Sequence, residues 1–274
     1  MPSPEPRVHP TAVVDPAARL APGVVIGPFC VVGEGVSLGT GTILESHVHI
    51  DGQIEIGADN RFSPFVAVGG APQDVGYKGE ATRIRIGDRN VFRESVTVHR
   101  ATTKQDRVTI IGDDNYFMAY SHVAHDCAVG NKTIFLHGAT LGGHCVVGDS
   151  ALVGAMSGLH QFCRVGRFSF MGGGSMVTQD VLPFCRVAGQ RPTRMIGLNL
   201  VGLRRNGFSR ERIAGIKRIF DLLFYQGQNT SQALARIEAE IPPSEDREEI
   251  LSFIRSAKRG IVKKTSGTWD GESE

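Results

Sequence analysis

Four histidines in the middle of the sequence are spaced so that a repeating fold would bring them together. His125, His144 and His160 recur at similar intervals, and His122 lies just before His125. Imidazole changes charge near neutral pH, so such a cluster can transfer protons or bind a metal ion. Asp126 directly follows His125, as expected of a carboxylate that orients an imidazole and stabilises its protonated form.

Two kinds of chemistry compete for these histidines. Zinc would take three nitrogen ligands and keep an open position, as in a β-helical carbonic anhydrase of the gamma type. Asp126 beside His125 favours proton transfer instead, with His125 as the general base. Gly143 directly precedes His144, so the same repeat would let its backbone N–H face the oxyanion of an acyl transfer. The residues therefore favour acyl transfer without a metal or cofactor, and histidines with no chemical role are the plain alternative.

A six-residue repeat is the element that must position these side chains. Steps of six from Val8 to Val68 meet eleven consecutive apolar residues, and after a one-residue phase slip the steps from Ile111 to Val177 meet twelve. Short strands that turn a corner every sixth residue give this period, and three such units close a coil of about 18 residues. The pattern predicts a mainly β fold, a parallel β-helix over residues 1–190, in which residues one coil apart stack at about 4.8 Å.

The repeat is interrupted twice and then ends. We expect loops to leave the coil near residues 69–83 and 100–109, and loops of this kind often line the binding face of a solenoid. Beyond the repeat the apolar spacing becomes helical, with Ser209 as a helix N-cap, which predicts a C-terminal α-helical domain over 191–264. The tail, 265–274, is expected to be disordered. The glycines that so often follow the apolar repeat position are expected to relax tight corners.

Cysteine offers a second candidate for chemistry. Cys127, Cys145 and Cys163 are spaced by one predicted coil each and would stack as a column of thiols. Small residues fill the same repeat position elsewhere, and the spacing C-x-x-C is absent from the sequence. We therefore interpret these cysteines as small core residues rather than a metal or redox site.

Composition excludes several classes of protein. A formal net charge of +2 over 274 residues does not predict a nucleic-acid-binding protein. No apolar stretch approaches the roughly 20 residues of a membrane span, and the first ten residues do not resemble a signal peptide. The chain is expected to be cytoplasmic, with no stable membrane insertion.

Longer motifs around the histidines resemble one family, the UDP-N-acetylglucosamine O-acyltransferases, which catalyse the first step of lipid A synthesis. The resemblance covers nearly the whole chain. It is carried by Gln73-Asp74, Arg93 to Arg100, His122 to Cys127, Gly142-Gly143-His144, His160 to Cys163 and Gly202 to Arg210.

The resemblance implies a left-handed coil, a C-terminal helical bundle and a homotrimer with active sites between neighbouring subunits. The implied reaction moves an (R)-3-hydroxyacyl chain from acyl carrier protein to the glucosamine 3-hydroxyl of UDP-N-acetylglucosamine, with His125 as the base. A different acyl acceptor, including a 3-amino sugar, and the preferred chain length stay open at this point.

The resemblance also implies roles for further residues. Sugar-nucleotide contacts are implied at Asp74, His99, His122, His144, His160, Gln161, Asn199 and Arg205. Gly173 is implied to limit acyl length, because a bulky residue there would shorten the accepted chain. A basic patch suited to the acidic carrier protein is formed by Arg204, Arg205 and Arg210.

Three positions depart from the pattern of the family. Val201 stands where an acidic residue is expected, Asn206 where a second arginine of a pair is expected, and Gly76 where a lysine is common. We expect Lys78, two residues further on, to take over from that lysine.

Overall fold

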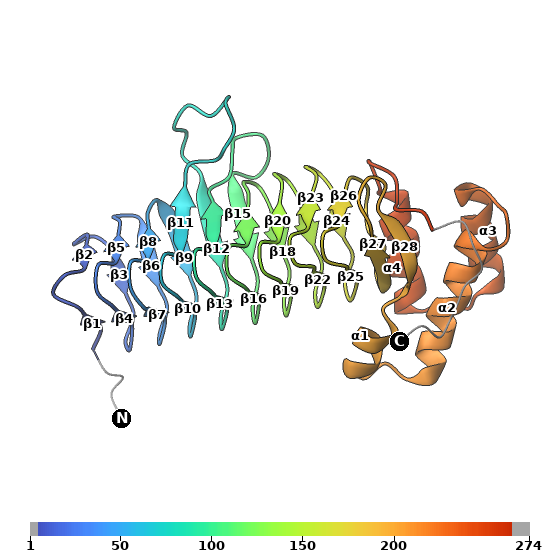
Figure 1. The fold of residues 1–274 in the computed structure, drawn as a ribbon, viewed down its shortest axis with the longest axis horizontal. Helices are drawn as coiled ribbons and strands as arrows, with labels where there is room; N and C mark the ends of the chain where they lie inside the picture. The colour runs from blue at the N-terminus through green and yellow to red at the C-terminus, as the bar shows by residue number, and fades with distance from the viewer. Residues whose placement is uncertain (1–4, 265–274) are drawn as a thin grey trace.

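The structure is a computed structural model that describes residues 5–264. Its strands stack as the three flat faces of a long prism, with helices at the C-terminal end (Figure 1). One sheet contains β1 (Arg7–Val8), β4 (Val25–Ile26), β7 (Ile43–Leu44), β10 (Arg61–Phe62), β13 (Val91–Phe92), β16 (Tyr116–Phe117), β19 (Ile134–Phe135), β22 (Leu152–Val153), β25 (Phe170–Met171), β27 (Cys185–Ala188) and β28 (Arg194–Leu198).

The other two faces follow the same order along the prism. The second sheet contains β2 (Val13–Val14), β5 (Val31–Val32), β8 (His49–Ile50), β11 (Ala67–Gly70), β14 (Thr97–His99), β17 (His122–Val123), β20 (Thr140–Leu141), β23 (Gly158–Leu159) and β26 (Met176–Val177). The third contains β3 (Arg19–Leu20), β6 (Val36–Leu38), β9 (Gln53–Ile56), β12 (Arg83–Ile86), β15 (Val108–Ile111), β18 (Ala128–Val129), β21 (Val146–Val147) and β24 (Arg164–Val165).

Residues one repeat coil apart in sequence pair between neighbouring coils, as predicted. His122 pairs with Thr140, and Val123 pairs with Leu141, in parallel register. From Ile26 onward the apolar repeat positions are buried and form one core, whereas Val8, at the start of the coil, is exposed. Four of them stack as an aromatic column along the prism, with ring centroids 4.7 to 4.8 Å apart: Phe62, Phe92, Phe117 and Phe135.

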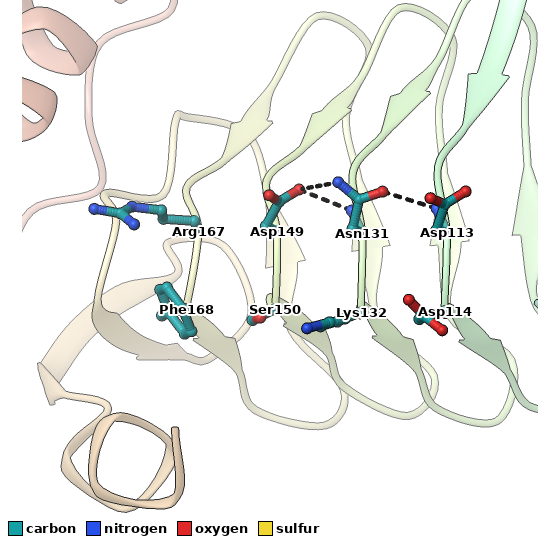
Figure 2. Close-up of a pocket in the computed structure, with 8 residues that line it drawn as sticks. All are labelled: Asp113, Asp114, Asn131, Lys132, Asp149, Ser150, Arg167 and Phe168. Carbon is teal, nitrogen blue, oxygen red and sulfur yellow. Dashed lines mark hydrogen bonds between the residues drawn. The ribbon is translucent and has the colours of Figure 1, made fainter. Parts of the chain in front are cut away.

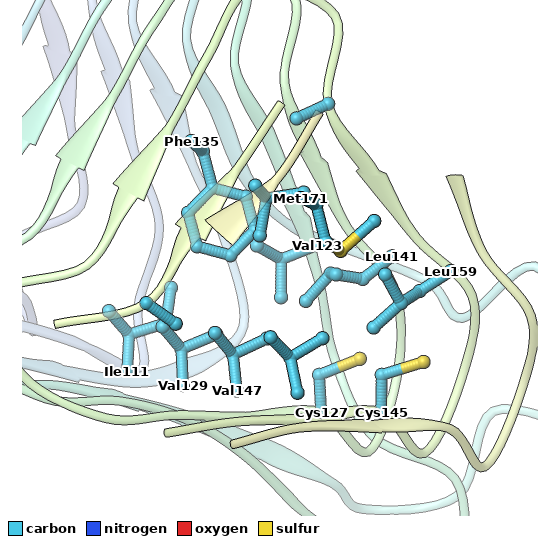
Figure 3. Packing of buried hydrophobic residues seen from close by; sticks show 14 of the residues in the cluster. Ile111, Val123, Cys127, Val129, Phe135, Leu141, Cys145, Val147, Leu159 and Met171 are labelled. Carbon is cyan, nitrogen blue, oxygen red and sulfur yellow. The ribbon is translucent and has the colours of Figure 1, made fainter. Parts of the chain in front are cut away.

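The cysteines lie inside this core. Figure 3 shows Cys127 and Cys145 side by side beneath Leu141 and Leu159. Each of these two thiols donates to a backbone carbonyl of the next coil, Cys127 to Gly142 and Cys145 to His160, at 3.2 Å. Burial raises the pKa of Cys163 to about 12, so this thiol stays protonated at neutral pH.

The corners of the coil differ from the sequence-based expectation. Residues with side chains occupy the left-handed corner positions: Asp126 (φ 60°), His144 (φ 63°) and Phe162 (φ 66°). The glycines that follow the apolar positions serve another purpose, because the next coil passes too close for a side chain. A Cβ on Gly148, for example, would lie 2.6 Å from the backbone nitrogen of Arg167.

Two loops leave the coil on one side of the prism (Figure 1). Residues 71–82 connect β11 to β12, and residues 100–107 connect β14 to β15. The coil resumes its register after each loop, with β12 pairing to β9 and β15 pairing to β12.

Helices follow an antiparallel pair, β27 and β28. They are α1 (Leu200–Arg205), α2 (Arg210–Phe224), α3 (Thr230–Glu240) and α4 (Glu245–Arg255). Ser209 caps α2 as predicted, since its side chain accepts from the Arg212 N–H. The buried Asp246 of α4 accepts hydrogen bonds from Arg167 at the end of the coil and from Arg212 of α2. The tail for which disorder is expected, 265–274, lies outside the described residues.

The aromatic column makes a test of the core possible. Phe92 is fully buried between Phe62 and Phe117. Phe92→Ala is expected to lower the free energy of unfolding by about 3–5 kcal/mol, because it removes the ring and leaves a cavity. Urea denaturation followed by circular dichroism measures the loss. Phe92→Leu, which keeps most of the volume, is the matched control, and equal midpoints for the two variants would contradict the packing described.

Candidate active site

Three successive coils bring the predicted residues to one corner. His125 follows β17, His144 follows β20 and Phe162 follows β23. The His144 N–H donates to the His125 carbonyl at 3.0 Å, which fixes the spacing of the first two coils. The His144 ring meets the His125 ring edge-on at 5.1 Å between centroids and stacks on Phe162 at 4.4 Å.

His125 and Asp126 form a buried pair at this corner. His125 Nδ1 lies 2.8 Å from Asp126 Oδ2, and the two residues are only 4% and 7% exposed. A carboxylate accepts hydrogen bonds, so Nδ1 carries the hydrogen and the lone pair of Nε2 is left for another partner. Asp126 Oδ2 also accepts from the backbone N–H (3.0 Å) and the hydroxyl (2.7 Å) of Thr102.

Gly143 lies against the His125 ring. A Cβ at this position would stand 2.6 Å from His125 Nε2, closer than two such atoms can approach. Any other residue at position 143 would displace the His125 ring, so this position requires glycine. This contact confirms that Gly143 and His125 are neighbours one coil apart.

A second pair of histidines lies beside the first. The His99 and His122 rings meet edge-on at 4.8 Å, and His122 Nδ1 is 2.7 Å from the Thr97 hydroxyl. Burial lowers the pKa of His122 to about 4, and the neighbouring His99 and His125 add to this effect. Burial also lowers the pKa of His99, so both rings are neutral at pH 7. The buried Nδ1 of His99 has no hydrogen-bond partner among residues 5–264.

The two loops supply contacts that the sequence did not predict. Gln105 Oε1 lies 2.9 Å from His144 Nδ1, and burial lowers the pKa of His144 despite the opposing charge of Asp126. Lys104 pairs with Asp74 across the loops, and that hydrogen bond lowers the pKa of Asp74. The cation beside Asp74 is therefore Lys104, and the nucleotide contact expected of Lys78 stays a prediction. None of these loop residues belongs to the repeat, so periodicity gave no signal for them.

The remaining predicted residues lie at the exposed edge of this corner or in other parts of the molecule. His160 and Gln161 are exposed, with Gln161 beside Gly142 of the preceding coil. Asn199 caps α1: its side chain accepts from the Gly202 N–H and donates to the Phe168 carbonyl at 2.9 Å.

The three arginines of the basic patch, and the glycine implied to limit acyl length, also lie outside the corner of the coil that holds His125. Arg204 and Arg205 are exposed in α1, which lies below the last coils in Figure 1, and Arg210 is exposed at the start of α2. Gly173 is exposed directly after β25 and its neighbour, Gly172.

One group of described residues has the donors for a metal ion. The ligand atoms of His125, Asp126 and His144 lie within 4.8 Å of one another. His125 Nδ1 meets Asp126 and His144 Nδ1 meets Gln105, so Nε2 is the nitrogen of each ring that remains for a ligand. Because Asp126 already accepts from His125 and Thr102, the geometry favours a hydrogen-bonded proton-transfer site.

A shallow hollow at a different corner holds none of these residues. Figure 2 shows its ladder of Asp113, Asn131 and Asp149, in which each side chain accepts from a backbone N–H of the preceding coil. Arg167 and Phe168 close one end. Because the ladder satisfies the coil's own backbone, we interpret it as structural.

The stacked coils and the histidine corner define a hexapeptide-repeat transferase. Residues 109–143 match the family described as bacterial transferase hexapeptide (six repeats). Residues 180–262 match domain 2 of UDP N-acetylglucosamine O-acyltransferase. The chain belongs to the family of UDP-N-acetylglucosamine O-acyltransferases.

Individual relatives support this membership. The acyl-[acyl-carrier-protein]–UDP-N-acetylglucosamine O-acyltransferase of Stenotrophomonas maltophilia strain R551-3 is 45% identical over 94% of this chain and 98% of its own length. The namesake from Syntrophobacter fumaroxidans is 42% identical over 94% of this chain and 100% of its own. The solved UDP-N-acetylglucosamine acyltransferase of Francisella novicida is 35% identical, with a TM-score of 0.92 over 94% of this chain and 95% of that one.

The coil is left-handed, as the resemblance implied and as the solved structures of this family support. Within residues 5–264, no helix is long and apolar enough to cross a membrane.

The depressed pKa of His122 predicts a dependence of stability on pH. In the folded protein His122 takes up its proton only near pH 4, whereas the unfolded chain does so near 6.5. The contribution of neutral His122 is therefore complete above pH 6.5 and is lost as the pH falls from 6.5 to about 4. An NMR titration of the His122 ring is expected to show a midpoint near pH 4.

His122→Asn provides the control, because it keeps a polar side chain that does not titrate. Its stability is expected to fall less between pH 6.5 and 4 than that of the wild type. Equal losses would contradict the assigned pKa.

Proposed function

We propose that the protein transfers an (R)-3-hydroxyacyl chain from acyl carrier protein to the glucosamine 3-hydroxyl of UDP-N-acetylglucosamine, as the first step of lipid A biosynthesis in the cytoplasm. The substrates are those in the names of its relatives. The observation that carries the chemical part is the buried His125–Asp126 pair, which leaves His125 Nε2 free to act as a base. The site needs no cofactor or metal for this reaction.

In the proposed mechanism, His125 Nε2 takes the proton of the sugar hydroxyl while the hydroxyl oxygen attacks the thioester carbon. Asp126 keeps the imidazole in the required tautomer and stabilises the imidazolium that forms. The tetrahedral intermediate then breaks its C–S bond. The carrier thiolate leaves and receives the proton back from His125.

Gly143 is proposed to stabilise the oxyanion of that intermediate. Its backbone N–H makes no hydrogen bond within residues 5–264, and it lies against the His125 ring. An oxyanion donor of this kind contributes about 3 kcal/mol to the transition state.

The other site residues are proposed to hold the sugar nucleotide. Around the His125–Asp126 pair these are Asp74, His99, His122, His144, His160 and Gln161. Asn199, which bonds the Phe168 carbonyl at the last coils, and Arg205 in α1 lie away from His125 of the same chain, and we propose that they act at the site of a neighbouring subunit in a homotrimer. The exposed Arg204, Arg205 and Arg210 are proposed to receive the acidic carrier protein, and Gly173 to limit acyl length.

One assay tests this proposal. Purified protein is incubated with UDP-N-acetylglucosamine and a panel of 3-hydroxyacyl carrier proteins, and His125→Ala is expected to lose roughly 10²–10⁴-fold in turnover. His9→Ala, an exposed histidine of the first coil, is the matched control. Turnover by His125→Ala at the wild-type rate would refute the base assignment. Absence of turnover with every chain length would favour another acceptor, such as a 3-amino sugar.

Metal-dependent hydration is the second candidate, because His125, Asp126 and His144 could together bind zinc. Treatment with a chelator distinguishes the two. The acyltransferase is expected to keep its full rate after dialysis against EDTA, since neutral imidazole is the only base the mechanism uses. A loss restored by zinc would instead support a metal site.

A further inference from the structure

The loop formed by residues 100–107 reaches the catalytic pair through one buried side chain. We propose that Thr102 is a positioning residue: it holds the Asp126 carboxylate so that His125 keeps its hydrogen on Nδ1 and presents Nε2 to the acceptor hydroxyl. This inference rests on the proposed function. Neither the repeat nor the family motifs point to Thr102.

A directed chain of hydrogen bonds connects the loop to His125. The Lys104 backbone N–H donates to Thr102 Oγ1 at 3.2 Å, so the Thr102 hydroxyl hydrogen is free to point at Asp126. That hydroxyl and the Thr102 N–H lie 2.7 and 3.0 Å from Asp126 Oδ2, the oxygen that also meets His125 Nδ1 at 2.8 Å. Three donors therefore converge on one carboxylate oxygen.

The strand that follows this loop also contacts Asp126. Thr109, in β15, accepts the Asp126 backbone N–H at 3.0 Å. Asp126 is in the left-handed region (φ 60°), which is uncommon for residues other than glycine although aspartate adopts it more readily than most. Thr109 thus fixes the backbone of Asp126, and Thr102 fixes its carboxylate.

Without Thr102 the carboxylate would have a competing partner. His144 Nε2 lies 3.7 Å from the same Asp126 Oδ2, and Asp126 Oδ1 is buried without a hydrogen bond to residues 5–264. Rotation of the carboxylate toward His144 would weaken its contact with His125 Nδ1. The His125 hydrogen could then move to Nε2, which abolishes the lone pair that takes the substrate proton.

Thr102 is 3% exposed, so it acts through Asp126 and has no surface to offer the substrate. We therefore expect its loss to change kcat and to leave KM for the sugar nucleotide within about twofold. A hydrogen bond to a charged group corresponds to a fall of about 10- to 100-fold in rate when it is removed.

The experiment compares Thr102→Val with Thr102→Ser in the full-length protein. Thr102→Val keeps the shape and the backbone N–H but removes the hydroxyl, and kcat is expected to fall about 10- to 100-fold. Thr102→Ser restores the donor and is expected to recover most of that rate. Thr103→Val, on the exposed neighbouring threonine, is the matched control for the loop.

A spectroscopic signature separates positioning from mere stability. Nitrogen-15 NMR of labelled histidine reports which ring nitrogen of His125 carries the hydrogen, with the resonance assigned by its absence in His125→Asn. The wild type and Thr102→Ser are expected to show the Nδ1–H form, and Thr102→Val a mixture with Nε2–H. An unchanged tautomer together with a rate within twofold of the wild type would overturn the proposal.

Two further arms keep the outcome interpretable. If Thr102→Val does not fold, as judged by its melting curve, Thr102→Ala is measured in its place and judged by the same two readouts. If the wild type does not turn over UDP-N-acetylglucosamine, the proposed function fails. The tautomer comparison still decides the role of Thr102 in that case, because it needs no substrate.

Discussion

Parallel hydrogen bonding between successive coils is the constraint on which the rest of this molecule depends. Each coil returns the backbone to the same place in the cross-section of the prism, so that Val123 lies over Leu141 and His122 over Thr140. A slip of one residue would exchange the inward and outward faces of a whole strand. The register therefore keeps the aliphatic core closed and sets His125, Gly143 and His144 against one another.

The periodic part of the fold could be predicted because the position of a residue in the coil follows from counting along the six-residue repeat. A residue that follows His125 by three repeats must lie one coil away, which is why Gly143 and its neighbour His144 could be placed from the sequence alone. Handedness was different, since the spacing of apolar residues is the same in a left-handed and a right-handed coil. It came from the family resemblance, and the usual right-handed crossover preference would have predicted the opposite.

The residues that the sequence could not reveal lie outside the period. Thr102, Lys104 and Gln105 belong to a loop whose path back to the site depends on its own turns rather than on the repeat. The left-handed backbone conformation at the corners could not be predicted either, because it is uncommon for residues such as His144 and Phe162. Interstrand hydrogen bonds on both sides offset this local strain, and these bonds form only when the coil is complete.

A buried charge network joins the coil to the C-terminal helices. Arg167 from the last coils and Arg212 from α2 share the buried Asp246 of α4. Removing either arginine would leave that carboxylate less well compensated, so charge pairing fixes how the two parts meet. A separate hydrogen bond, from the α1 N-cap Asn199 to the Phe168 carbonyl, connects the start of α1 to the coil.

The buried cysteines, which include the column of Cys127, Cys145 and Cys163, give the protein a set of internal reporters. All five cysteines are unpaired and at most 2% exposed, and they are distributed from Cys30 near the first coils to Cys185 near the last. A thiol reagent in solution meets them only when the backbone around each one opens. Because a solenoid can open from its ends, the order in which the thiols become modified would record where the coil unwinds first.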